Sequence, residues 1–314
     1  MNRWRHLRAG LLLMLAVATA GAQNQQPKRI NKAIDLLSQG QPIWYDGGHG
    51  GYEEGVRMAQ TWADYITYDM EHGPFDVGKL AEFMRGLVKG GPTRSGHRTP
   101  AVIVTLPTDG TNEAVMRANA WMVKQALATG IHGILLCHAD DPGAVKAFVE
   151  SARLPFHRIG VNEGLDEGRR GAHASAAAGA IWGISAKEYA QKADVWPLNP
   201  NGEILLGLKI EDKHALANVE KSLKVPGIAF AEWGPGDMGY SLGFPENHDP
   251  PYPPAMLAAR AKVLAACKTH KIFFLSTMMP NDVIDVIKEG VMIGAGSAEA
   301  AEIGRKFMKR PQPW

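Results

Sequence analysis

The chain has 314 residues, 45% of them hydrophobic, which is enough to build one large domain or two small ones. Its 34 basic and 32 acidic residues give a formal net charge of +2, and no basic stripe stands out along the chain. This balance argues against nucleic acid as a partner and favours small neutral or anionic ligands.

The first 22 residues have the pattern of a signal peptide. MNRWRHLR is basic, AGLLLMLAVATA is apolar, and ATAGAQ supplies the small residues that a signal peptidase accepts. The apolar run is shorter than the roughly 18 residues that a membrane-spanning helix needs, so we expect cleavage and no membrane anchor afterwards. We therefore expect a signal peptide at 1–22, a linker at 23–29, one domain at 30–314, and a periplasmic or secreted protein.

Two cysteines, Cys137 and Cys267, are too few for a disulfide framework and lack the spacing of a zinc site. Cys137 lies in an apolar run and Cys267 in a helical pattern, so both are most simply explained as buried packing residues. A single bridge between them stays open on the sequence alone.

From residue 29 onward, helical and strand-like segments alternate. Residues 29–40 have the spacing of a helix that ends at Gly40. Short β-type runs follow at 42–46, 64–69, 101–107, 133–139, 204–211, 227–233, 271–277 and 290–296. Between most of them, apolar residues recur at helical spacing, at 77–90, 111–130, 142–153, 213–224 and 254–271.

The strand runs are nearly continuous in Val, Ile and Leu, which is typical of parallel strands buried on both faces. Eight strand and helix units over roughly 250 residues predict an α/β fold with a single (β/α)8 TIM barrel. A doubly wound open sheet is the rival. The count of eight and the lack of a GxGxxG motif after any strand favour the barrel.

In such a barrel the chemistry belongs at the carboxyl ends of the strands and in the loops that follow them. Polar residues do collect at those positions: Asp46, His49, Asp69, Glu71, His72, Thr105, Thr108, His138, Asp140, Asp141, Glu211, Asp212, Trp233, Asp237, Ser276 and Thr277. Two longer segments extend this end. Residues 160–203 are too long for a plain turn, and the prolines of 243–254 exclude helix and strand. Either segment is a candidate to close over a ligand or to carry a subunit contact.

Three motifs carry a resemblance to a known family. YDMEHGP (68–74) ends the second predicted strand, GLKIED (207–212) ends the fifth, and WGPGDMGY (233–240) follows the sixth. Together they resemble the HpcH/HpaI aldolase and citrate lyase family of metal-dependent pyruvate-type aldolases, from residue 30 or so to the C-terminus. The resemblance implies a TIM barrel of the phosphoenolpyruvate/pyruvate-binding type.

The resemblance makes Glu211 and Asp237 the ligands of a divalent metal. Two carboxylates, completed by water and substrate oxygens, suit Mg²⁺, Mn²⁺ or Co²⁺ better than zinc. A metal of this kind chelates a 2-oxo acid and stabilises the enolate that carbon–carbon cleavage produces. The competing interpretation, a pair of solvated loop carboxylates, ranks second.

The resemblance also assigns proton transfer to His72, whose unperturbed pKa of about 6.5 suits this work at neutral pH. Of the two neighbouring carboxylates, we expect Asp69 to be the functional one and Glu71 to form a salt bridge. The residues expected to bind substrate are Arg170, Gly236, His49 and His138. For the two histidines, proton transfer or metal binding stays open.

The chain departs from the family's pattern at three places. Leu106 stands where an arginine commonly polarises the ketone, Ala128 where an aspartate partners the histidine, and Cys137-His138 where Pro-Met is common. The leading hypothesis is an exported metal-dependent carbon–carbon lyase that acts on a small oxo or hydroxy acid, or on a larger related compound. These departures keep a metal-dependent hydrolase, hydratase or decarboxylase open, and a binding protein ranks lowest. The resemblance further implies a homo-oligomer, either a trimer or a hexamer.

Overall fold

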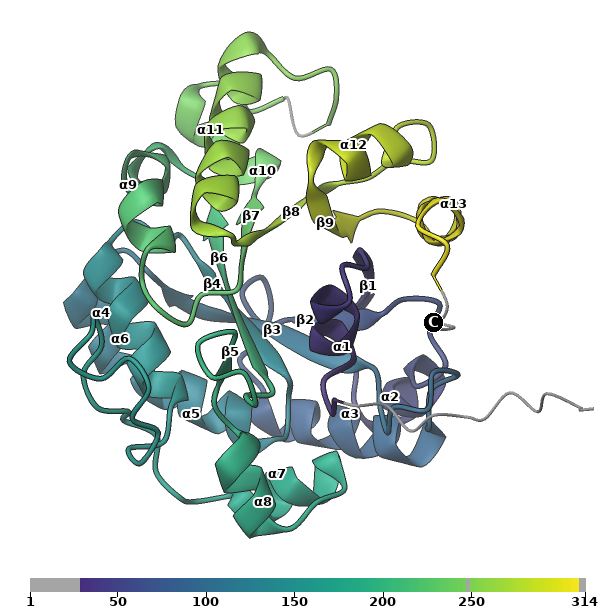
Figure 1. Ribbon diagram of the computed structural model, residues 1–314, viewed down its shortest axis with the longest axis vertical. Helices are drawn as coiled ribbons and strands as arrows, with labels where there is room; N and C mark the ends of the chain where they lie inside the picture. The colour runs from purple at the N-terminus through teal and green to yellow at the C-terminus, as the bar shows by residue number, and fades with distance from the viewer. Residues whose placement is uncertain (1–28, 247–248, 311–314) are drawn as a thin grey trace, which may run out of the picture.

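Eight parallel strands close into a barrel (Figure 1). The computed structural model describes residues 29–246 and 249–310. The barrel strands are β1 (Ile43–Gly48), β2 (Tyr65–Asp69), β3 (Ala101–Asp109), β4 (Gly133–Cys137), β6 (Ile204–Ile210), β7 (Phe230–Trp233), β8 (Phe273–Thr277) and β9 (Val291–Ala295). β4 pairs with β6, and β9 pairs with β1, which closes the ring. The predicted TIM barrel and its eight strand runs are confirmed.

Helices surround the barrel (Figure 1). The predicted ones are α1 (Lys32–Ser38), α3 (Val77–Gly90), α6 (Pro142–Ala152), α9 (Lys213–Leu223) and α11 (Pro254–His270). The helix predicted at 111–130 is divided at Asn119 into α4 (Glu113–Ala118) and α5 (Ala120–Ala128). Further helices are α2 (Tyr52–Met58), α7 (Ser175–Trp182), α8 (Ala186–Lys192), α10 (Pro235–Leu242), α12 (Val283–Glu289) and α13 (Ala298–Phe307). In the described ranges, no helix is both long and apolar enough to cross a membrane.

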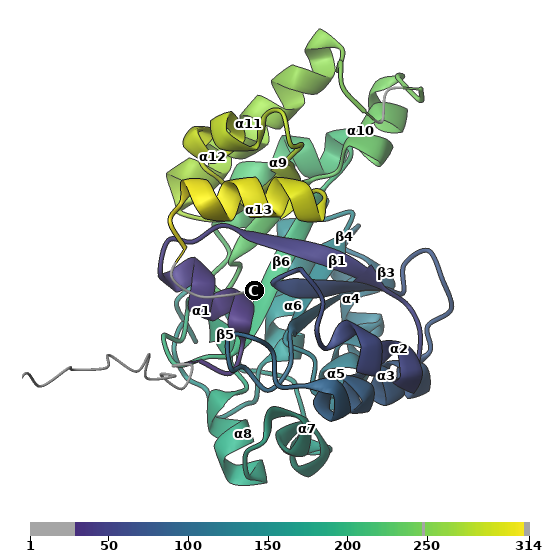
Figure 2. The same ribbon diagram turned by 90° about the vertical axis from the view of Figure 1, so that its right-hand side faces the viewer.

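Helix α1 closes the amino end of the barrel (Figure 2). It packs on the inward-facing strand side chains in one core cluster that includes Ala33, Ile34, Leu36, Leu37, Ile43, Tyr65, Ile103, Leu135, Leu205, Phe230 and Leu275. The Asn31 side chain begins the helix by accepting the N–H groups of Ala33 and Ile34. Its amide also donates to the carbonyls of His132 and Glu203, just before β4 and β6. The barrel interior is therefore filled at this end and opens at the carboxyl end.

The strand side chains that alternate with these point outward, under the helices. They join a second core cluster that includes Val102, Val104, Leu106, Ile134, Leu136, Leu206 and Leu208. Because successive side chains of a strand point to opposite faces, this alternation decides which strand-end residues face the interior. In the middle of β3, Thr105 faces inward and Leu106 faces the helices.

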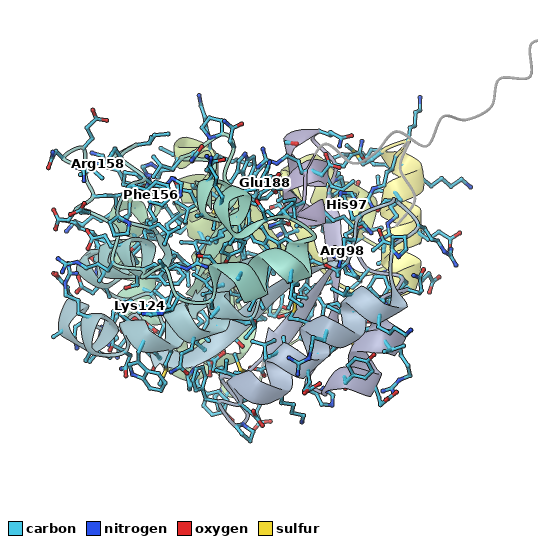
Figure 3. All side chains as sticks on the ribbon, turned by 90° about the horizontal axis from the view of Figure 1, so that it is seen from below. His97, Arg98, Lys124, Phe156, Arg158 and Glu188 are labelled. Carbon is cyan, nitrogen blue, oxygen red and sulfur yellow. The ribbon has the colours of Figure 1, made fainter. Side chains whose placement is uncertain are left out.

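The two long segments, 160–203 and 243–254, lie at different places on the barrel. Residues 160–203 form α7, α8 and the short β5 (Val195–Trp196), which pairs with the start of β6. They pack outside the barrel beside α3 and α5, where the Arg98 side chain donates to the carbonyls of Ala180 and Ile181 (Figure 3). The segment at 243–254, of which 247–248 lie outside the described residues, stays near the carboxyl end, since Tyr252 packs edge-on against Trp233. Cys137 and Cys267 are free and buried, so the bridge left open by the sequence is not formed.

Helices α2 and α3 cross in close contact at glycines. A Cβ atom at Gly86 would lie 2.1 Å from the carbonyl oxygen of Tyr52, and one at Gly55 would lie 2.2 Å from that of Phe83. Both neighbours are backbone atoms, which cannot rotate away. The two helices can therefore approach this closely only where the side chain is a hydrogen.

We expect Gly86→Ala to lower the free energy of unfolding by about 1–3 kcal/mol, because the added methyl group forces α2 and α3 apart. Urea denaturation followed by circular dichroism measures the change. Gly171→Ala is the control, since its Cβ would meet no atom nearer than 3.9 Å, and it should change stability by less than about 0.5 kcal/mol. Equal stability of the Gly86 variant and the unmodified protein would contradict this packing.

Candidate active site

The carboxyl ends of the strands and the loops that follow them form the rim of the barrel. Asp69 is the last residue of β2, and Glu71 and His72 follow it. Glu211 directly follows β6, and Asp237 lies in the first turn of α10, after β7. Barrel closure places these segments on one face, although they are up to 168 residues apart in the chain (69 to 237).

Asp69 and His72 form a hydrogen-bonded dyad on this rim. The Nδ1 atom of His72 lies 2.8 Å from Oδ2 of Asp69. Oδ1 of Asp69 accepts the Thr105 hydroxyl at 2.7 Å and the backbone N–H groups of Glu71 and His72 at 2.9 and 3.2 Å. An aspartate that accepts the N–H groups two and three residues ahead fixes a tight turn, so the strand-end sequence itself orients the imidazole.

The electrostatics of the dyad follow from these contacts. Burial by itself would raise the pKa of Asp69, but the hydrogen bonds from Thr105, His72 and the two backbone N–H groups outweigh it and lower the pKa to about 2. The hydrogen bond to Asp69 in turn raises the pKa of His72 above its ordinary value. The dyad therefore pairs a carboxylate that is ionised at neutral pH with a histidine that is more basic than usual.

A second group of side chains has the geometry of a metal site. One donor atom from each of His138, Glu211 and Asp237 lies within 4.8 Å of the others. Oε1 of Glu211 accepts the backbone N–H of His138 at 2.9 Å, and burial raises the pKa of Glu211. Gly234 leaves room for this carboxylate, because a Cβ there would lie 3.0 Å from its Oε2. The structure thus brings the two predicted ligands together and adds His138, for which the sequence left substrate binding, proton transfer and metal binding open.

Lys209 and Glu232 are site residues that the sequence reasoning missed. They are partners in the register of β6 and β7, and both face the barrel interior. The Nζ atom of Lys209 lies 2.7 Å from Oε2 of Glu71 and 3.7 Å from Oε2 of Glu211. Glu71 therefore forms the expected salt bridge. The available signal for Lys209 was that it is a single charged residue inside an otherwise apolar strand. It also lies two positions before Glu211, and so on the same face of the strand.

The dyad, Glu71, Lys209 and Glu232 line a cavity of about 150 Å³, called here the rim cavity. Its polar lining is Tyr45, Tyr65, Thr67, Asp69, Glu71, His72, Thr105, Lys209 and Glu232, and its apolar lining is Ile103, Leu135, Phe230 and Leu275. Burial raises the pKa of Glu232 to about 7. For Lys209, burial alone would lower the pKa, but the surrounding negative groups, Glu211 and Glu232 foremost among the carboxylates, raise it.

A side pocket of about 270 Å³ also has Asp69 in its lining. Its lining is His49, Tyr68, Asp69, Gly73, Pro74, Asp76 and Lys79. The Tyr68 hydroxyl donates to the Gly50 carbonyl at 2.8 Å, which attaches the glycine-rich loop after β1 to β2. His49 therefore lies beside the dyad rather than at the metal-type cluster. Gly236 lies one residue before Asp237 in the first turn of α10, where backbone N–H groups have no intrahelical acceptor.

Arg170 does not lie at the rim, which corrects the predicted substrate contact. Its side chain is buried, its guanidinium lies 5.3 Å from the ring centroid of Tyr189, and Nη2 donates to the Tyr189 hydroxyl. That hydroxyl donates in turn to the carbonyl of Leu127 near the end of α5. A guanidinium held between α5 and α8 packs the outer layer and cannot reach a ligand in the rim cavity.

Two of the residues at which the sequence departs from the family's pattern do not line the rim cavity. Leu106 faces the outer helices, so no side chain at that position projects into the rim cavity. Ala128 is the last residue of α5 and lines an outer groove with Tyr52 and Arg85. The partner of His72 within the chain is Asp69.

Comparisons with known proteins identify relatives of this chain. A family model described as HpcH/HpaI aldolase/citrate lyase matches residues 56–301. A 2-keto-3-deoxy-L-rhamnonate aldolase from Shigella dysenteriae is 32% identical over 189 residues, which are 60% of this chain and 58% of the relative. A hydroxypyruvate/pyruvate aldolase from Agrobacterium fabrum is 24% identical over 298 residues, which are 91% of this chain and 98% of the relative. Some matches, that to the Shigella enzyme included, span less than two thirds of the relative's own length.

A solved structure gives the same fold. An HpcH/HpaI aldolase/citrate lyase family protein from Burkholderia cenocepacia aligns with a TM-score of 0.63 over 86% of this chain and 93% of that one, at 20% identity. At this identity the likeness shows the fold alone.

We expect Asp69→Asn to lower the pKa of His72, because it removes the carboxylate whose hydrogen bond raises that pKa. An NMR titration of the His72 ring measures the shift. Asp76→Asn is the matched control, since Asp76 accepts the Lys79 N–H at the start of α3 and should leave the His72 titration in place. An unchanged His72 pKa in the Asp69 variant would show that the dyad is not formed in solution.

Proposed function

Because the chain belongs to the HpcH/HpaI aldolase/citrate lyase family, we propose that it is an exported, divalent-metal-dependent carbon–carbon lyase of the aldolase type. Its substrate is a small hydroxy acid with an oxo group, cleaved into an oxo acid and an aldehyde or ketone. Family and relatives together indicate an aldolase or lyase. Metal-dependent cleavage is supported by one observation: the Asp69–His72 dyad and the His138, Glu211 and Asp237 cluster lie on the same rim.

The donor set fits a divalent cation. Donor atoms of Glu71, Cys137 and Glu211 also lie within 4.8 Å of one another, but the Lys209 ammonium already lies beside both carboxylates there. In the His138, Glu211 and Asp237 cluster, Lys209 lies beside Glu211, but the described ion pairs include none with Asp237. Two carboxylates and an imidazole suit Mn²⁺, Co²⁺ or Mg²⁺, with the imidazole favouring the first two. An ion bound there would act as a Lewis acid toward the oxo group of the substrate.

The residues of this chain then divide the work of cleavage. His72 removes the proton from the hydroxyl group next to the bond that breaks, and Asp69 holds the imidazole and stabilises the imidazolium that forms. The electron pair of the broken carbon–carbon bond passes to the oxo acid fragment as its enolate, and the other fragment leaves as a carbonyl compound. Asp69 lines both the rim cavity and the side pocket, so a separate space for each of the two fragments adjoins the dyad.

The hydrolase, hydratase or decarboxylase alternative is not favoured. It rested on Leu106 and Ala128, and neither side chain lies at the rim cavity. The named relatives are aldolases. Carbon–carbon cleavage is therefore the favoured reaction.

Export and assembly are part of the same proposal. The signal peptide at 1–22 and the linker at 23–29 lie almost entirely outside the described residues, so the support for export is the sequence pattern of 1–22. Support for a homo-oligomer, a trimer or hexamer, is the family resemblance. Fractionation of a bacterial host with mass spectrometry of the mature N-terminus tests export, and light scattering tests assembly. A cytoplasmic, uncleaved chain would contradict the first, and a monomer would contradict the second.

Chelation should abolish release of the oxo acid, and Mn²⁺, Co²⁺ or Mg²⁺ should restore it. Glu211→Gln and Asp237→Asn should each lower kcat/KM at least about 100-fold, since even residues that only support a metal ligand are worth 10–100-fold. A coupled dehydrogenase assay over a panel of hydroxy oxo acids measures the product. Asp285→Asn, on the exposed face of α12, is the control. Full activity in both ligand variants would mean that the metal role is wrong.

His72→Gln should lower kcat by about 10²- to 10⁴-fold while metal binding stays intact, because only the proton acceptor is lost. Since His72 must be neutral to accept a proton, kcat/KM should rise with pH through the raised pKa of His72. In Asp69→Asn this rise should move to lower pH. A pH profile that is the same in both proteins would exclude His72 as the base.

A further inference from the structure

We propose that the Lys209 ammonium binds the oxyanion of the oxo acid fragment, which makes Lys209 a substrate-binding residue that selects an anionic substrate and stabilises its enolate. This inference rests on the proposed lyase function and names a contact that the function itself does not require. The observations that carry it are the position of Lys209 in the rim cavity, its free donors and the charges around it.

The position of Lys209 joins the two halves of the site. Nζ lies 2.7 Å from Glu71, whose carboxylate is 3.8 Å from Nδ1 of His72, and 3.7 Å from Glu211 of the metal-type cluster. An anionic oxygen between the base and the cluster therefore lies within reach of this ammonium. The side chain is only 13% exposed, and that exposure is toward the rim cavity, which Lys209 lines.

The ammonium has donors left for a ligand. A lysine carries three N–H donors, and among the described residues Lys209 donates one hydrogen bond, to Glu71. Its register partner Glu232 also lines the rim cavity. The lysine is thus held in place by carboxylates without having all of its donors occupied.

The charges of the rim cavity explain why such a cation is needed. Three carboxylates, those of Asp69, Glu71 and Glu232, line the rim cavity, and an acid substrate entering it meets their repulsion in a partly buried site. Besides His72, Lys209 is the basic residue of the lining. A charge-assisted hydrogen bond from Lys209 to the substrate oxygen offsets this repulsion and strengthens as negative charge develops during cleavage.

Oxalate tests the proposal, because it is a planar dianion shaped like the enolate of a small oxo acid. Calorimetry on the Mn²⁺-loaded full chain compares the unmodified protein with Lys209→Met, Lys209→Arg and the control Lys213→Met, which changes an exposed lysine at the start of α9. Loss of a charged hydrogen bond should raise the Kd of oxalate by about 10- to 100-fold in Lys209→Met. Lys209→Arg should recover part of this loss, and Lys213→Met should match the unmodified protein.

Separate readouts distinguish substrate binding from a structural role. Manganese titration by electron paramagnetic resonance and a thermal melt should show that Lys209→Met still binds metal and folds, so that a change in oxalate affinity is not a loss of the site. Unchanged oxalate affinity in Lys209→Met would overturn the proposal, and so would failure of the unmodified metal-loaded protein to bind oxalate. Borohydride trapping of a covalent pyruvate adduct on Lys209 would also overturn it, since the proposed contact is non-covalent.

The lyase proposal and the Lys209 proposal fail in different ways. If the protein binds oxalate through Lys209 but releases no oxo acid from any hydroxy oxo acid, the reaction is wrong and the lysine contact stands. If oxo acid is released and Lys209→Met binds oxalate and turns over like the unmodified protein, the lysine contact is wrong and the reaction stands.

Discussion

The site depends on the closure of one parallel sheet, in which β4 pairs with β6 and β9 pairs with β1. Parallel closure leaves all carboxyl ends on one rim, so residues from 69 to 237 meet without any long-range sequence signal. Helix α1 fills the opposite end and attaches to the strand starts through Asn31. The interior is consequently open toward the rim, and the polar side chains that face inward near the rim are those available for chemistry.

Charge balance is the second constraint on the rim. Carboxylates outnumber cations there, and Glu211 and Glu232 are sufficiently buried that desolvation raises the pKa of each. The Lys209 ammonium and a divalent ion at the His138, Glu211 and Asp237 cluster can offset this negative charge. The proposed reaction uses both, since the enolate that forms on cleavage needs positive charge on the same side as the base that starts it.

Much of the fold could be predicted from the sequence because it follows from local patterns. The eight strand runs and the helices at 77–90, 213–224 and 254–271 were read from apolar periodicity and end signals, and they lie where expected. The site was predicted less well. The positions of Asp69, His72, Glu211 and Asp237 were expected, whereas Arg170 was wrongly placed at the rim and Lys209 and Glu232 were missed. Arg170 was misjudged because its burial against Tyr189 depends on where α8 packs, which no local pattern reports.

By itself, the sequence determined the class of fold, the strand-end motifs and the local Asp69 turn that orients His72, because each depends on residues close together in the chain. The tertiary structure alone decided which side chains of each strand face inward, so that Thr105 and not Leu106 meets the dyad. It also decided that Lys209 bridges Glu71 and Glu211. These contacts are set by strand register and barrel closure, which join segments that are distant in sequence through backbone pairing rather than through side-chain identity.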